Sequence, residues 1–384
     1  MAGSADMKKV LPLLALTAVA VALVGCTEAP ERTASPRPVP TASASTEPTA
    51  PLIGAVAPVG EATALAAGLQ APWSVVPVQS GSALVSERDT ASVVELTADG
   101  QARVAGVVEG VVPGGEGGLL GLAVLPEDSG ATWLYAYFTG ADDNRIVRMP
   151  LEGGAGTFAL GAPEVILEGI AKARNHDGGR LAFGPDGMLY ATSGDAGQPG
   201  AAQDPLSLNG KILRMTPEGD VPADNPIEGS LTWSYGHRNP QGIAWTESGA
   251  MYAAEFGQDT WDEINRIEPG SNYGWPEAEG IVGDSSFVDP IVQWSTDEAS
   301  PSGLAAVGSS LFVAGLGGER LWIVQGADSG SPTTDAAFGE LGRIRDVIAA
   351  PDGTLWMLTG NTDGRGDPRE GDDRLVSVPL TSAG

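Results

Sequence analysis

Short apolar runs separated by turn residues recur along the chain from about residue 61 to its end. The runs have the length of β-strands, and the residues between them are rich in glycine, proline, aspartate and serine. This pattern is typical of strands joined by tight turns. No segment keeps an apolar period of about 3.6 residues, so we expect few helices and an all-β fold.

An internal repeat sharpens this expectation. A strand of small and aliphatic residues is followed by a turn and by a second strand that carries a pair of apolar or aromatic residues. The copies cover residues 73–88, 120–138, 179–195, 241–257, 302–318 and 345–361, at steps of 43 to 62 residues. Six copies at this spacing predict a six-bladed β-propeller of four-stranded antiparallel blades. In such a fold the loops at one end of the inner strands converge on the central channel, where function is expected.

The N-terminal segment has the pattern of a secretory signal. Lys8 and Lys9 precede an apolar run over residues 10–24, which is too short to span a bilayer comfortably as a permanent helix. The run leads into LVGC, which resembles the lipobox of bacterial lipoproteins, where cleavage before the cysteine leaves its thiol to carry lipid. We therefore expect a signal peptide over residues 1–26 and lipidation of Cys26. An ordinary thiol inside a membrane helix is the alternative.

Cys26 is also the only cysteine in the 384 residues. A lone cysteine excludes an internal disulfide, CxxC zinc sites, covalent haem attachment and thiolate iron–sulfur clusters. The segment over residues 27–60 is dominated by proline, serine, threonine and alanine, which is typical of a disordered tether. The propeller is then expected over residues 61–384.

The clearest candidate chemistry lies in the third repeat. RLAF and MLYAT have the composition of two short strands, and GPDG between them supplies proline and glycine at turn positions. A hairpin brings its two ends together, so His176 before the first strand and Asp195 after the second should lie at the same edge. A histidine beside a carboxylate is a candidate oriented base. A solvated loop histidine near an unrelated aspartate is the alternative.

The fourth repeat carries a second polar set in the equivalent position. Arg238 and Asn239 precede its first strand as His176 precedes that of the third, so they should face the same channel mouth. A guanidinium offers a planar fork for carboxylates or carbonyls, and an amide can both donate and accept. Residues 255–263 add carboxylates and a glycine turn, a composition suited to Ca²⁺, with simple solvation as the alternative in a chain of net charge −28. This acidity argues against a nucleic acid partner.

Six ordered motifs make the chain similar to the soluble PQQ-dependent sugar dehydrogenases, the glucose/sorbosone dehydrogenase group of six-bladed propellers. The motifs are GGEGGLLGLAV (114–124), NHDGGRLAFGPDGMLYATSGDAG (175–197), LNGKILRM (208–215), GHRNPQGIAW (236–245), DEINRIEPGSNYGWP (262–276) and GRIRDVIAAPDG (342–353). The resemblance covers roughly residues 62–380. It implies an enzyme that passes hydride from a sugar to the quinone cofactor PQQ.

The resemblance also implies roles for single residues. His176 matches the general base that takes the proton from the sugar C1 hydroxyl, and Asp195 matches the carboxylate that orients this base. Arg238 and Asn239 match the pair that contacts the quinone, where the arginine polarises a quinone oxygen. Glu116 stands where a glutamine contacts the cofactor in the best-known members, and a glutamate is less able to donate a hydrogen bond.

The remaining matches concern the charge of the cofactor and a metal ion. Arg343 and Arg345 match two arginines that pair with cofactor carboxylates. The backbone carbonyls of Gly257 and Gln258 match those that bind the Ca²⁺ ion bridging to PQQ.

One position departs from the family pattern. Leu316 is followed by Gly317, where a basic residue normally stands. Either Arg320 reaches round to replace that cation, or it forms a salt bridge on the blade surface. Because each charge-assisted contact in a pocket for a tricarboxylate should matter, the departure predicts weaker binding of PQQ than in other members.

Together these features predict an extracytoplasmic oxidoreductase, held to the bacterial cell membrane by its lipid anchor, that uses PQQ and Ca²⁺ to oxidise an aldose or related sugar at C1 to a lactone. Electrons would pass to an external acceptor, because the chain has no haem site. The second hypothesis is a non-catalytic propeller that binds carbohydrate or protein, since propellers host many functions. The histidine–aspartate pair and the arginines at the channel mouth together favour the enzyme.

Overall fold

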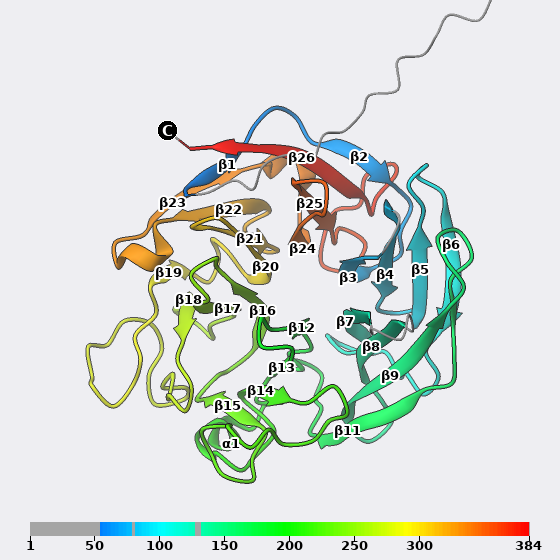
Figure 1. Ribbon diagram of the computed structural model, residues 1–384. Coiled ribbons are helices and arrows are strands. Elements are labelled where there is room, and N and C mark those ends of the chain that lie inside the picture. The colour runs from blue at the N-terminus through cyan, green and yellow to red at the C-terminus, as the bar shows by residue number, and fades with distance from the viewer. Residues whose placement is uncertain (1–53, 79–80, 127–131, 384) are drawn as a thin grey trace, which may run out of the picture. The chain divides into compact units, whose positions relative to one another are not determined.

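The computed structural model describes residues 54–78, 81–126 and 132–383, all within one compact unit, residues 48–384. Six antiparallel sheets stand around a central axis (Figure 1). The predicted all-β, six-bladed propeller is confirmed. Each of the six predicted repeats covers the first two strands of one blade. The predicted signal peptide, the predicted lipidation site Cys26 and most of the predicted tether lie outside the described residues.

The strands of blades one to three follow one another in chain order from the channel outwards (Figure 1). Blade one contains β3 (Pro72–Pro77), β4 (Ala83–Glu87), β5 (Ser92–Leu96) and β6 (Ala102–Val107). Blade two contains β7 (Leu119–Pro126), β8 (Thr132–Thr139) and β9 (Asn144–Glu152), and both β10 (Ala159–Leu160) and β11 (Glu164–Ile170) pair with β9. Blade three contains β12 (Leu181–Phe183), β13 (Leu189–Ser193), β14 (Lys211–Met215) and β15 (Thr232–Tyr235).

Blades four and five repeat this order, and blade six is built from both ends of the described chain. Blade four contains β16 (Pro240–Trp245), β17 (Met251–Glu255), β18 (Trp261–Ile267) and β19 (Val292–Ser295). Blade five contains β20 (Pro301–Val307), β21 (Ser310–Gly315), β22 (Arg320–Gln325) and β23 (Thr333–Ala337). Blade six contains β24 (Ile344–Ala349), β25 (Thr354–Thr359) and β26 (Leu375–Ser382), with β1 (Val56–Pro58) and β2 (Thr63–Ala66) paired to β26.

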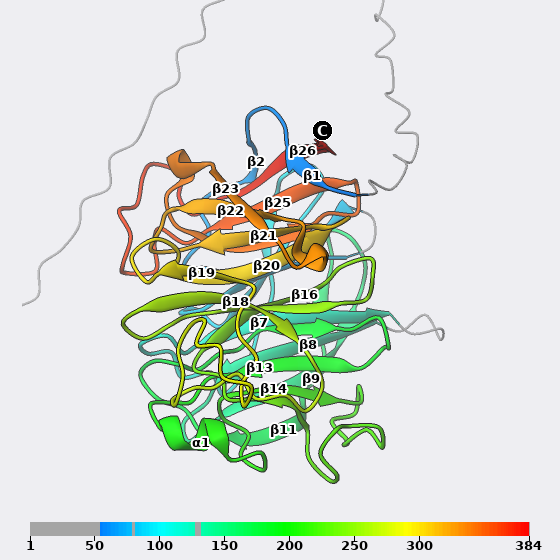
Figure 2. The same cartoon turned by 90° about the vertical axis from the view of Figure 1, so that its left-hand side faces the viewer.

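The strands β1 and β2 close the ring by pairing antiparallel with β26 (Figures 1 and 2). The predicted tether boundary at residue 60 was therefore wrong, because Val56–Pro58 already belongs to the propeller. Val56 is fully buried and packs in the core shared by blades five and six. The pairing also gives the edge of β26 its hydrogen-bond partners. The polar composition of the predicted tether gave no sign of this pairing.

The hydrophobic core lies between neighbouring blades. One cluster joins Phe312 of blade five to Val347 and Met357 of blade six, and another joins Tyr137 of blade two to Leu181 of blade three. Middle strands are thus buried on both faces, and this explains why their sequences read as apolar runs rather than as alternating patterns.

Helices are few, as predicted. The described residues hold one short α-helix, α1 (Pro199–Gln203), and two 3₁₀ turns, Ala327–Ser329 and Gly339–Leu341. Within the part of the chain that the structure describes, no helix is long and apolar enough to cross a membrane.

An ion pair crosses the central channel. Arg180 directly precedes β12 of blade three, and its Nη1 lies 2.9 Å from Oδ2 of Asp346 on β24 of blade six, on the opposite side of the ring. The Arg180 guanidinium stacks over the indole of Trp73 from blade one, 4.3 Å from the ring centroid. All three side chains are buried, so they fill the channel at this level.

Candidate active site

The predicted site residues converge at one end of the channel. Glu116, His176, Arg238 and Arg343 stand in the segments that lead into the inner strands β7, β12, β16 and β24. Because the inner strands start at the same end of a propeller, these segments share one mouth. Hydrogen bonds and ion pairs connect all four segments.

His176 and Asp195 meet as the hairpin predicts. The strands β12 and β13 pair around the turn at residues 184–187, and His176 Nδ1 lies 2.7 Å from Asp195 Oδ1. His176 has a left-handed backbone with φ of +63°. Its carbonyl packs so closely on Gly194 that a Cβ there would collide with it, which explains the glycine before Asp195.

The Asp195 carboxylate is built to stay ionised and in place. It is fully buried, which opposes ionisation, but hydrogen bonds from His176, Trp275 and Gly197 outweigh this penalty and lower the pKa of Asp195. Trp275 Nε1 donates to Oδ2 at 2.8 Å, and the Gly197 N–H donates to Oδ1 at 2.8 Å. With a carboxylate facing Nδ1, the proton of a neutral imidazole resides there, and Nε2 is the nitrogen that can accept.

Glu116 and Asn239 complete the wall beside the histidine. Oε2 of Glu116 accepts the backbone N–H of His176 at 3.0 Å and the Asn239 amide at 3.3 Å. The amide oxygen of Asn239 accepts the N–H of Gly178 at 3.1 Å. Glu116 therefore acts here as an acceptor, a role in which a carboxylate serves at least as well as a glutamine.

Arg238 lies across Trp275. Its guanidinium carbon is 5.4 Å from the indole centroid, and Nη1 donates to the Gly257 carbonyl at 2.6 Å. Its Nε is buried and has no hydrogen-bond partner. The neighbouring His237 is fully buried, and both of its ring nitrogens have partners, Nδ1 at 2.8 Å from Glu255 and Nε2 at 2.8 Å from Ser234.

Arg343 and Arg345 share one counter-ion that the sequence did not single out. Asp363, in the loop after β25, lies 3.0 Å from Arg343 and 3.3 Å from Arg345. Burial opposes the ionisation of Asp363, but the two arginines overcome this and lower its pKa. Burial lowers the pKa of Arg345 to about 10. The Nε of Arg343 is buried without a partner.

The residues predicted to hold Ca²⁺ make other contacts. The Gly257 carbonyl accepts from Arg238, and the N–H of Gln258 donates to Glu279 at 2.7 Å. Asp262 accepts the backbone N–H groups of Gly257 and Ser300, at 2.9 and 2.6 Å. Within the described ranges, no three histidine, cysteine or acidic residues form a cluster that could hold a metal ion. The Asp262 carboxylate thus serves as an acceptor for backbone groups.

The position of the missing cation in blade five lies close to Ser300. A Cβ on Gly317 would meet the Ser300 hydroxyl, which would have to rotate away. Arg320 does not reach the mouth: its Nε donates to the Gly318 carbonyl at 2.6 Å, and its guanidinium lies over Trp322. Among the described residues Arg320 forms no salt bridge either, so the stacking on Trp322 replaces the predicted surface ion pair.

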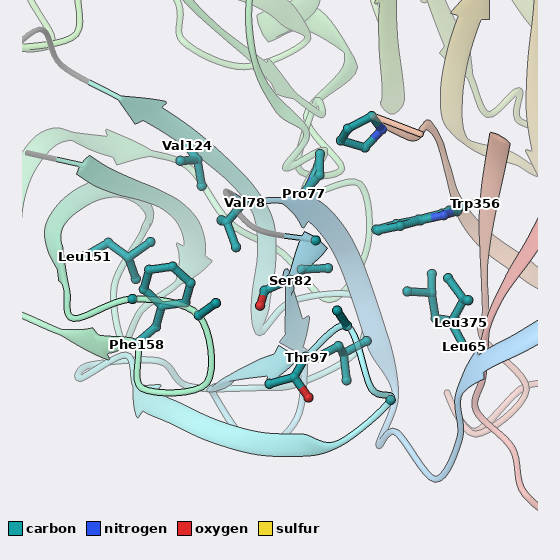
Figure 3. A pocket seen from close by; sticks show the side chains of 18 of the residues that line it. Leu65, Pro77, Val78, Ser82, Thr97, Val124, Leu151, Phe158, Trp356 and Leu375 are labelled. Atoms are coloured by element: carbon teal, nitrogen blue, oxygen red, sulfur yellow. The ribbon is translucent and has the colours of Figure 1, made fainter. Parts of the chain in front are cut away.

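A cavity of about 790 Å³ lies at the other end of the inner strands. Its lining includes Pro77 at the end of β3, together with Val124, Leu151 and Phe158, whose side chains surround it in Figure 3. Of the described residues that line it, only Asp352 is charged. The titratable cluster at the channel mouth, and not this apolar cavity, is therefore the candidate active site.

A family model described as Glucose / Sorbosone dehydrogenase matches residues 69–366. The chain belongs to this family. The family predicted from the six sequence motifs is confirmed, and so is the prediction of an oxidoreductase that acts on CH–OH groups. Membership also favours the enzyme over the non-catalytic binding module.

Relatives of the chain in the glucose/sorbosone dehydrogenase family carry more specific names. An aldose sugar dehydrogenase of Escherichia coli is 33% identical over 296 residues, which cover 65% of this chain and 76% of that protein. Quinoprotein glucose dehydrogenase B of Acinetobacter calcoaceticus is 34% identical over 203 residues, 45% of this chain and 42% of that protein. Among solved structures, the PQQ-bound form of aldose sugar dehydrogenase from Streptomyces coelicolor is 50% identical, with a TM-score of 0.80, and covers 86% of this chain and 99% of that chain.

Proposed function

We propose that this protein oxidises an aldose or a related sugar at C1 to the lactone, with PQQ as cofactor and His176 as general base. The observation that carries the proposal is the contact of His176 Nδ1 with Asp195 at 2.7 Å, at the same channel mouth as Arg238, Arg343 and Arg345. The similar proteins, which include a PQQ-bound aldose sugar dehydrogenase, support the same substrate and cofactor classes.

The donors at the mouth fit an anionic quinone. Buried polar atoms normally have partners, yet the Nε atoms of Arg238 and Arg343 have none. Carboxylate and quinone oxygens are acceptors that would satisfy them. Arg343 and Arg345 would hold carboxylates of PQQ, while Arg238 and Asn239 would hold its quinone edge.

When bound, PQQ supplies an electron-poor quinone that accepts the hydride from the sugar C1. His176 is placed to receive the matching proton, since Asp195 holds the proton of the neutral ring on Nδ1 and Nε2 makes no hydrogen bond to any described residue. Asp195 then stabilises the imidazolium that forms. Proton and hydride together account for the two hydrogens that leave the sugar.

Arg238 supplies fixed positive charge beside this proton transfer. Its stacking on Trp275, which also binds Asp195, ties the guanidinium to the base through one indole. A preorganised cation of this kind stabilises negative charge as it develops and needs no rearrangement during the reaction.

Calcium stays a prediction of the family resemblance. In the structure the Gly257 carbonyl already accepts from the Arg238 guanidinium, an arrangement that does not fit a cation at the same oxygen. Binding of Ca²⁺ at Gly257 and Gln258 would require Arg238 to leave this carbonyl. No step proposed above therefore depends on the metal.

The location and the acceptor complete the proposal. The LVGC segment supports export and lipidation at Cys26, which would place the propeller outside the cytoplasm on the bacterial cell membrane. Electrons would leave through an external acceptor, because Cys26 as sole cysteine excludes a covalently attached haem.

Reconstitution tests the function. Purified protein is titrated with PQQ, with and without Ca²⁺, and sugars are then screened with an artificial electron acceptor while the product is identified by NMR. We expect lactone formation that depends on PQQ. Bound PQQ without turnover of any sugar would refute the substrate class, and failure to bind PQQ under either condition would refute the function.

A further inference from the structure

Glu116 presents an electrostatic problem for the proposed function, on which this inference rests. Its carboxylate lies in the wall of a site that would bind a multiply charged anion, and its side chain keeps about 20% of its exposure. A like charge beside a bound carboxylate disfavours binding. The site must therefore offset this charge in some way.

The structure offers a partner from a distant loop. Arg365, in the segment between β25 and β26, has its Nη1 at 3.4 Å from Oε1 of Glu116. The contact joins the mouth segments of blades six and two, which are 249 residues apart in the chain. The other carboxylate oxygen of Glu116 is occupied by His176 and Asn239.

The Arg365 backbone is held in place independently of this ion pair. Its N–H donates to Oδ1 of Asp363 at 2.9 Å, while Oδ2 of the same carboxylate binds Arg343 and Arg345. One aspartate thus fixes three arginines of the mouth. The Arg365 side chain is about half exposed, so it stands at the outer rim.

The charge balance of the mouth depends on Arg365. The contacts named above bring together four guanidinium groups and three carboxylates, namely those of Arg238, Arg343, Arg345 and Arg365 and those of Glu116, Asp195 and Asp363. Arg88 also donates to the Asp363 carbonyl, but Asp89 balances its charge. Without Arg365 the cluster has no net charge, and with it the cluster carries one positive charge.

We infer that Arg365 neutralises Glu116 and thereby makes a glutamate compatible with an anionic cofactor. The pair is neutral as a whole, so it offsets the glutamate and does not make up for the cation that blade five lacks at Gly317. Glu116 keeps its hydrogen bonds to His176 and Asn239 without imposing an unpaired negative charge on the ligand.

Calorimetric titration with PQQ tests the inference through a double-mutant cycle. The variants are Arg365→Ala, Glu116→Gln and their combination, each measured as apoprotein at low ionic strength. Arg369→Ala is the matched control, because Arg369 belongs to the same loop but donates to the Glu340 carbonyl instead of Glu116. Melting temperatures of the two arginine variants show whether folding is intact.

We expect Arg365→Ala to weaken PQQ binding about tenfold, which corresponds to about 1.4 kcal/mol. Because salt screens half-exposed charges, this loss of PQQ affinity should be smaller in 0.5 M salt. In the Glu116→Gln background the same arginine substitution should change the affinity less than twofold, since the half-exposed guanidinium then has no carboxylate that holds it at the mouth. Arg369→Ala should bind as the wild type does.

Two results would overturn the inference while leaving the proposed function intact. One is wild-type affinity in Arg365→Ala. The other is an equal loss in both backgrounds, which would mean that Arg365 acts on the ligand and not on Glu116. If the wild type itself takes up no PQQ, the proposed function fails and the inference fails with it.

Discussion

At the scale of single residues, His176 is placed by contacts on both its ring and its backbone. Its N–H is held by Glu116, its ring by Asp195, and its backbone adopts a left-handed conformation. Such a conformation is uncommon for a residue with a side chain and persists only where the surroundings fix it. This placement gives the first prediction.

His176→Ala should lower kcat by about 10²–10⁴, the usual contribution of a general base, with PQQ affinity changed less than about threefold. Asp195→Asn should lower kcat less, because the imidazole remains and only its orientation and charge partner are disturbed. Steady-state kinetics with sugar and an artificial acceptor, beside calorimetry with PQQ, separate the two effects. Unchanged turnover in His176→Ala would place the proton transfer on another group.

At the scale of elements, blade four buries two carboxylates side by side. Glu255 on β17 pairs with Glu263 on β18, and the Asn265 amide bridges their side chains, at 3.5 and 3.0 Å. Burial, followed by the charge of Glu255, raises the pKa of Glu263 to about 8. Burial and the neighbouring carboxylate thus favour the protonated form of Glu263 in the folded protein.

The raised pKa of Glu263 predicts a pH dependence of stability. From the unfolded pKa of 4.5 up to about 8, the folded state keeps a proton that the unfolded state has lost, so the free energy of unfolding falls as the pH rises. Glu263→Gln removes this titration and should flatten the decline, which is on the order of a few kcal/mol. Urea denaturation at pH 5, 6, 7 and 8 measures it.

Glu268→Gln is the control, because Glu268 is exposed and only meets Arg266 at the surface. It should keep the wild-type slope. An equally steep decline in Glu263→Gln would show that Glu263 is ionised in the folded state.

At the scale of the whole molecule, the propeller depends on strands from both ends of the described chain. Val56 of β1 is fully buried between blades five and six, and β1 covers the outer edge of β26. Loss of a buried valine alone costs about 1.5–3 kcal/mol. The contribution of β1 is therefore large for a strand of three residues.

A chain that begins at residue 59 should lose about 2 kcal/mol or more of unfolding free energy relative to a chain that begins at residue 54. The second chain keeps β1 and is the matched control. Guanidinium denaturation of both compares them under the same conditions. Equal midpoints and slopes would show that β1 does not contribute to closure.

Anchoring is tested on the full-length protein in a bacterial host. If Cys26 carries lipid, Cys26→Ser should block processing or release the protein from the membrane fraction. Fractionation detects release from the membrane, and mass spectrometry of the N-terminus detects processing. A Cys26→Ser protein that is processed and membrane-bound like the wild type would contradict lipidation.

The sequence predicted what repeats or lies close along the chain. The blades follow from six similar segments, and the approach of His176 to Asp195 follows from a hairpin whose two ends are 19 positions apart. Asp363 and Arg365 could not be predicted, because they stand in a polar loop with no repeat signal. Arg365 is also 249 positions away from its partner Glu116. Trp275 stands in a predicted motif but carries no signal of its own for a role beside Asp195, to which its N–H donates.

The buried ion pair between Arg180 and Asp346 crosses the channel below the mouth. Under the proposed function, cofactor and sugar would then share one entrance, and the ligand that binds last would be the first to leave. A sugar bound nearer the entrance than PQQ would hinder dissociation of the cofactor. Cofactor loss would therefore be slowest during turnover. After dilution, activity should accordingly be lost more slowly as the sugar concentration rises. Without sugar, PQQ should dissociate fastest.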